Sequence, residues 1–268
     1  MKIMPFQPGR ISSIVMLTLW LGLALASAQL GAPGGLGGTP RGPRLSGSMT
    51  KLFGENSAFT AAMEMQMKND GGTEVMTVPG KVSFLDGKSR FEMELTKIQG
   101  NQLPAEAAGQ VKALGMDTVV MLSRPDQKLA YMIYPGLQAY LENALDATEL
   151  NGAPSDYQLA LTALGEETLD GHACVKNQAV ITDKDGQKHN AIVWNATDLK
   201  NFPIRIQQSE DGQAVTLHFR DVKLAKPEAD QFQPPAGFKR YDNMMGLIQQ
   251  VMMKQLGGGA APQPTPSK

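Results

Sequence analysis

Short stretches of this chain alternate strictly between apolar and polar residues, and tight-turn signals separate them. Every second position is apolar in residues 59–68, and the same period recurs in 90–95 and 215–220. Asp-Gly pairs, which tolerate the positive φ of hairpin turns, recur at 86–87, 170–171, 185–186 and 211–212. A two-residue period places the apolar side chains on one face of a strand. The pattern therefore predicts an antiparallel sheet that is covered on one side.

Two neighbouring stretches are instead apolar on both faces. Residues 118–122 and 130–134 flank a turn at 123–126, so the hairpin they form needs cover on its outer face as well. We expect helices to provide this cover. The candidate helices are 104–114, a short one within 140–150, and 242–256, which has a broad apolar stripe.

The composition excludes several classes of protein. The single cysteine rules out an internal disulfide, so stability must come from a packed core. The formal net charge is −1, and the sequence has no basic cluster of the kind that binds nucleic acid. It also has no phosphate-binding glycine loop, zinc-ligand spacing or Gly-x-Ser-x-Gly elbow. We therefore expect no catalytic residues, no cofactor and no nucleic-acid partner.

The first 28 residues are typical of a removable export signal. Lys2 and Arg10 precede an apolar run at 14–26, which is too short to span a bilayer and ends in a small-x-small cleavage site. Gln29, and not a lipid-carrying cysteine, follows that site. The sequence therefore predicts a soluble exported protein, periplasmic or secreted, with no stable membrane anchor.

The rest of the chain divides by composition into three parts. Residues 29–48 are rich in glycine and proline, which predicts a flexible lead-in, and 257–268 have the same character and predict a disordered tail. Residues 49–256 between them predict a single domain that ends in the amphipathic helix 242–256.

Five short sequence segments of this domain are characteristic when they are taken together. They are LGEETLDGHACVK at 164–176, VWNATDLKNFPIR at 193–205, FQPPAGFKRY at 232–241, FLDGKSR at 84–90 and YPGLQAY at 134–140. Together they resemble an uncharacterised family of exported bacterial proteins related to the LolA/LolB-like outer-membrane lipoprotein carrier superfamily. The resemblance implies a mainly β fold with a few helices: a curved, incomplete antiparallel β-barrel whose concave apolar face is closed by a helical lid. It implies no catalytic residues.

The predicted function is to bind an apolar small molecule, a lipid or a lipoprotein acyl chain in the concave sheet. The predicted ligand-binding residues are Met63, Met65, Met67, Phe91, Met93, Trp194, Ile204, Ile206, Leu217 and Phe219. The predicted lid residues, on the C-terminal helix, are Met244, Met245, Ile248, Val251 and Met252.

Three alternatives remain open at this point. In the first, the protein is a non-enzymatic interaction or structural module that fills its own cavity and contacts other envelope proteins. In the second, Met63, Met65 and Met67 bind Cu(I) through their soft thioethers, although unbroken strand alternation favours ordinary core packing. In the third, His172 and Cys174 form a reactive or metal-binding pair, although a strand beginning after the Asp170-Gly171 turn explains them more simply.

Overall fold

The computed structural model describes residues 47–68, 74–100, 104–145, 156–210 and 213–256. The chain falls into two units, residues 1–42 and 43–268, and all described residues belong to the second. The predicted export signal, most of the lead-in and the predicted tail lie outside the described residues.

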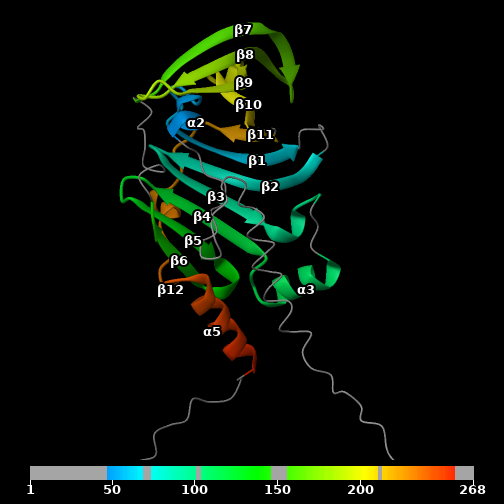
Figure 1. Cartoon of the computed structure of the whole chain (residues 1–268), viewed down its shortest axis with the longest axis vertical. Helices are drawn as coiled ribbons and strands as arrows, with labels where there is room; N and C mark the ends of the chain where they lie inside the picture. The colour runs from blue at the N-terminus through cyan, green and yellow to red at the C-terminus, as the bar shows by residue number, and fades with distance from the viewer. Residues whose placement is uncertain (1–46, 69–73, 101–103, 146–155, 211–212, 257–268) are drawn as a thin grey trace, which may run out of the picture. The chain divides into compact units, whose positions relative to one another are not determined.

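The described residues form one twelve-stranded sheet (Figure 1). The alternation predicted an antiparallel sheet, and the structure contains one. Its order is β12-β6-β5-β4-β3-β2-β1-β11-β10-β9-β8-β7. All neighbouring strands are antiparallel except β12 and β6, which are parallel. The strands are β1 (Ala58–Lys68), β2 (Glu74–Leu85), β3 (Lys88–Glu94), β4 (Thr118–Arg124), β5 (Leu129–Tyr134), β6 (Ala139–Ala144), β7 (Gln158–Leu169), β8 (His172–Thr182), β9 (Lys188–Ala196), β10 (Phe202–Glu210), β11 (Gln213–Lys223) and β12 (Lys239–Tyr241). The sheet is open, because β7 and β12 end the order without pairing to each other.

Short helices connect and flank the strands. The α-helices are α2 (Gly47–Lys51), α3 (Ala105–Ala113) and α5 (Met244–Leu256), and the 3₁₀ turns are η1 (Leu95–Lys97), η2 (Pro135–Leu137), η4 (Thr197–Leu199) and η5 (Ala229–Phe232). The helices predicted at 104–114 and 242–256 are therefore confirmed. The helix expected within 140–150 is wrong for residues 140–144. These residues belong to β6, because each of them pairs with a residue of β5 and the pairing buries Leu141.

The cover of the β4–β5 hairpin differs from the expectation. Its outer face carries Val120, Leu122, Tyr131 and Ile133, which form a buried cluster with Phe238 packed against it. The cover on this face includes the irregular segment between β11 and β12, and the Arg124 guanidinium donates a 2.9 Å hydrogen bond to the Phe232 carbonyl of η5. The need for cover was predicted correctly, but a segment whose only regular element is the 3₁₀ turn η5 contributes to it, where an α-helix was expected.

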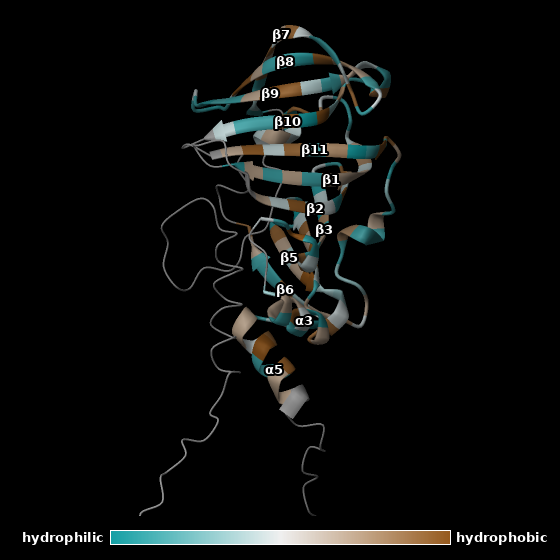
Figure 2. Ribbon diagram, turned by 90° about the vertical axis from the view of Figure 1, so that its right-hand side faces the viewer, coloured by the Kyte–Doolittle hydropathy of each residue, from teal (hydrophilic) through white to brown (hydrophobic). Residues whose placement is uncertain are grey.

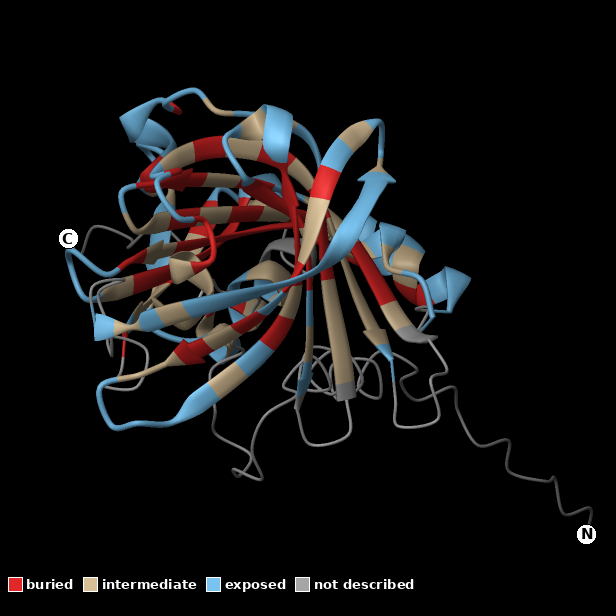
Figure 3. Ribbon diagram, turned by 90° about the horizontal axis from the view of Figure 1, so that it is seen from above, coloured by how far each residue is buried: buried red, intermediate tan, exposed pale blue. Residues whose placement is uncertain are grey.

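Buried and half-buried positions alternate along β1 and β3, so that one face of the sheet forms the core (Figure 3). The same alternation is visible as changing hydropathy along the strands in Figure 2. Strand β7 differs, because nearly all its residues are exposed, as expected for the last strand of the sheet.

Candidate functional site

The register of the sheet defines an apolar face, here called the inner face. Residues that lie directly opposite each other on neighbouring strands share a face. Met63 lies opposite Phe219, Met65 lies opposite Leu217, and Leu217 in turn lies opposite Ile206. The inner face therefore runs without interruption across β1, β11 and β10.

The same face continues in the other direction onto β2 and β3. Gly80 of β2 lies opposite both Met63 and Met93, so Met93 is on the inner face. Phe91, two positions earlier on β3, points to the same side. The register thus brings together eight of the ten predicted ligand-binding residues. They are Met63, Met65, Met67, Phe91, Met93, Ile206, Leu217 and Phe219.

Of the other two predicted residues, Trp194 lies on the opposite, outer face. It is directly opposite Arg205, which is opposite His218, and His218 is opposite Glu64. These residues alternate with the inner-face positions, so the expectation that Trp194 joins the cavity is corrected here. Ile192, Val193 and Trp194 are consecutive apolar residues, and the sequence alone cannot decide which of them points inward. Ile204, the last of the ten, is buried beside a β-bulge between Pro203 and Arg205.

One end of the inner face is filled by the chain itself. Phe53, which follows α2, is only 1% exposed and lies among four other phenylalanine rings. The distances from its ring centroid are 4.8 Å to Phe59, 5.8 Å to Phe84, 5.5 Å to Phe202 and 5.8 Å to Phe219. The Asn56 amide holds this segment in place by donating hydrogen bonds to the carbonyls of Phe53 and Lys200. Sequence reasoning missed Phe53, because it lies outside any alternating stretch.

The other end of the inner face is less covered. Met65 and Met67 are only half-buried, although Met63 on the same strand is fully buried. Met67 lies opposite Met76 on one side and opposite Val215 on the other, and both of these are also half-buried. Three adjacent strands therefore present a continuous apolar surface, here called the methionine end. Met76 was not among the predicted residues, because its alternation is interrupted by Pro79 and Gly80.

Helix α5 carries the predicted lid residues and contacts strand β12 (Figure 1). Leu247 is fully buried, whereas Met244, Ile248, Val251 and Met252 are half-buried. Met245 is 64% exposed and Met253 is 68% exposed. The Tyr134 hydroxyl, whose pKa is raised by burial, donates a 3.0 Å hydrogen bond to the Met132 sulfur and lies 3.9 Å from the Met244 sulfur. One side of α5 is therefore anchored to the domain, and the other presents methionine to solvent.

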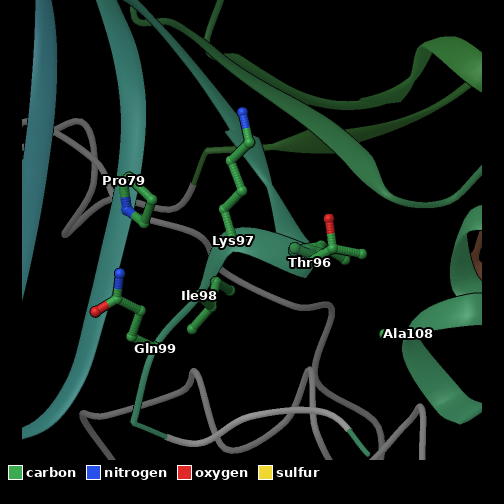
Figure 4. Close-up of a pocket in the computed structure, with 7 residues that line it drawn as sticks. Pro79, Thr96, Lys97, Ile98, Gln99 and Ala108 are labelled. Atoms are coloured by element: carbon green, nitrogen blue, oxygen red, sulfur yellow. The ribbon is translucent and has the colours of Figure 1, made fainter. Parts of the chain in front are cut away.

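A separate hollow of about 470 Å³ lies beside η1 (Figure 4). Its walls come from β2 through Pro79, from α3 through Ala108, and from residues 95–99 between them. The ammonium group of Lys97 is already paired with Glu94 at 2.9 Å. The hollow therefore offers no unpaired charge from Lys97 to a ligand.

The structure does not join His172 and Cys174 into a reactive pair. The Cys174 thiol is buried, which raises its pKa, and it donates to the backbone carbonyl of His172 at 3.4 Å. The His172 ring is bound elsewhere, with Nδ1 2.7 Å from the Asp198 carboxylate. Within the described ranges, no group of three or more His, Cys, Asp or Glu residues is placed to hold a metal ion. None of the described helices is long and apolar enough to cross a membrane.

The chain was compared with curated proteins, solved structures and protein-family models. No curated protein matches the chain. Among solved structures, a LolA superfamily protein from Nitrosomonas europaea is 13% identical, has a TM-score of 0.35, and is matched over 70% of this chain and 96% of that one. The lipoprotein LppX from Mycobacterium tuberculosis is 12% identical, with a TM-score of 0.34 and coverages of 66% and 91%. LprF from Mycobacterium bovis is 13% identical, with a TM-score of 0.36 and coverages of 68% and 93%.

The fold described above is mainly β, with a curved and open sheet, as the resemblance of the sequence segments implied. A family model described as a domain of unknown function, DUF4412, matches residues 59–202. Because this match covers more than half of the chain, the protein belongs to the DUF4412 family.

Proposed function

We propose that this protein is an exported carrier that binds a hydrocarbon chain, from a lipid or a lipid-modified protein, at the methionine end of its inner face. The observation that supports the proposal is the row of half-buried apolar side chains across three strands: Met65, Met67, Met76 and Val215. Burial of apolar ligand surface would drive binding, at about 25 cal/mol per Å². Methionine suits this role, because its flexible thioether adapts to ligands of variable shape.

The binding test compares two neighbouring residues that point to opposite faces. Met65→Glu places a carboxylate on the inner face, whereas Gln66→Glu places the same charge on the outer face of the same strand. Titration with the fluorescent fatty acid cis-parinaric acid measures affinity. We expect Met65→Glu to weaken binding by about ten-fold or more, because it removes a contact of roughly 1.5–3 kcal/mol. Gln66→Glu should bind like the unmodified protein.

Equal binding by both variants would contradict the proposed site. Failure of the unmodified protein to bind the fatty acid would support the second candidate, a non-enzymatic envelope interaction module. That candidate is favoured by a specific observation: Phe53 and its ring cluster already fill one end of the inner face.

Copper binding through Met63, Met65 and Met67 is tested in the same series. A Cu(I) titration that is unchanged when all three are replaced by leucine would exclude it.

A further inference from the structure

The turn between β7 and β8 is tied to the middle of the sheet by a buried histidine. His218 lies on β11 and is only 5% exposed. Its Nε2 atom hydrogen-bonds the carboxylate of Asp170, which belongs to the β7–β8 turn. Strands β9 and β10 lie between β11 and the β7–β8 hairpin in the sheet, so the turn must bend over the outer face to reach His218. Asp170 adopts a left-handed backbone conformation, with φ of 51°.

The partners of His218 fix its protonation state. Its Nδ1 atom lies 3.2 Å from the Nη2 atom of Arg220. A guanidinium has only hydrogen-bond donors, so Nδ1 must accept, and Nε2 must therefore carry the proton given to Asp170. The neutral ring satisfies both contacts. A second proton could go only on Nδ1, where it would face the guanidinium of Arg220.

The other charges around His218 are balanced. Glu64 on β1 lies opposite His218, and its carboxylate is 3.8 Å from Arg220. Arg205 on β10 lies opposite His218 on the other side. Asp170 is 3.7 Å from the Nε atom of Arg220. Burial is the main influence on the ring and lowers the pKa of His218, with Arg205 and Arg220 acting in the same direction and Asp170 opposing them.

We propose that His218, Asp170 and Arg220 form an acid-sensitive latch that releases the β7–β8 turn from the outer face when the His218 ring gains a second proton. Protonation places two cations in contact at Nδ1, and their repulsion displaces Arg220. Because the Nε atom of Arg220 lies 3.7 Å from the Asp170 carboxylate, Asp170 moves with Arg220, so that the turn leaves the outer face and water reaches the ring. The sign follows from the lowered pKa of His218. The latch is closed above about pH 6.5, the ordinary value for histidine, and opens as the pH falls below it.

Trp194 lies beside the latch and can report its state. It is 5% exposed, and its indole Nε1–H donates to the carboxylate of Glu167, three residues before Asp170. Lys176 lies 4.9 Å and Arg205 lies 5.5 Å from its ring centroid. Movement of the turn would take Glu167 from the indole and admit water to the ring.

The experiment measures acrylamide quenching of Trp194 fluorescence against pH in the full chain with Trp20→Phe, which removes the second tryptophan. We expect the quenching constant to rise about two-fold or more on acidification through the histidine range, reversibly and without loss of strand signal in far-ultraviolet circular dichroism. His218→Gln should abolish the rise, because the amide can donate to Asp170 and accept from Arg220 but cannot titrate. His172→Gln is the matched control and should leave the rise intact.

A second variant keeps the test decisive if His218→Gln fails to fold. Arg220 is about half exposed, so Arg220→Gln removes the cation without opening the core. It should abolish the acid response, because a protonated His218 would then simply strengthen its bond to Asp170. An unchanged response in Arg220→Gln or His218→Gln would overturn the latch. Constant quenching in the unmodified chain, or quenching that rises only with loss of strand signal, would overturn it as well.

Discussion

Truncation of the Phe53 side chain tests whether a residue from outside the sheet stabilises the packing of the inner face. Phe53 comes from the segment before β1, yet it contacts rings on β1, β2, β10 and β11. Phe→Ala in a core costs about 3–5 kcal/mol, and each favourable ring pair adds about 0.5–1.5 kcal/mol beyond the area buried. With four neighbouring rings, we expect Phe53→Ala to lower the free energy of unfolding by about 4 kcal/mol. This is a large part of the 5–15 kcal/mol that is typical of a domain.

Urea denaturation followed by far-ultraviolet circular dichroism measures this loss. The midpoint should fall while the slope with urea stays unchanged, which indicates that stability and not the extent of unfolding has altered. Phe53→Leu is the matched control and should cost about 1.5 kcal/mol or less, because it retains most of the apolar volume. A loss below about 1 kcal/mol for Phe53→Ala would refute the reasoning, since it would mean that Phe53 does not pack among these rings.

Two further predictions concern acid stability and backbone packing. The hydrogen bond from Arg124 lowers the pKa of Asp126, so this carboxylate stabilises the fold above about pH 4 and the contribution is lost as the pH falls through the lowered value. Asp126→Asn should therefore flatten the pH dependence of the urea midpoint in that acidic range, and an unchanged slope would contradict the assignment. A Cβ at Gly136 would lie 2.5 Å from the Gly115 carbonyl oxygen. Gly136→Ala should therefore lower the free energy of unfolding by about 1–3 kcal/mol, which is measured as a lower thermal unfolding temperature. Gly109→Ala in α3 meets no atom within 4 Å and should instead stabilise the protein by about 0.5–1 kcal/mol, so a loss in both variants would count against a steric cause.

The strands were predictable because their signal is local. Alternation in residues 59–68 fixes which side of β1 is apolar, and the Asp-Gly pairs at 86–87 and 170–171 mark hairpin turns that the structure contains. The helices α3 and α5 were predictable for the same reason, because helix-forming composition and an apolar stripe lie within one stretch of chain. Residues 140–144 were not, because their conformation depends on pairing with β5 and not on local propensity.

The sequence by itself determined that this chain forms an antiparallel sheet with one apolar face, and which residues of β1, β3 and β11 occupy that face. A two-residue period carries this information without reference to the rest of the chain. Only the tertiary structure decided the face of Trp194, the filling of one end by Phe53, and the meeting of Asp170 with His218. Each of these depends on strand register, on a segment outside the strands, or on the bending of a hairpin over the sheet. Such contacts join residues that are far apart in sequence, and the residue pattern within one short stretch does not specify them.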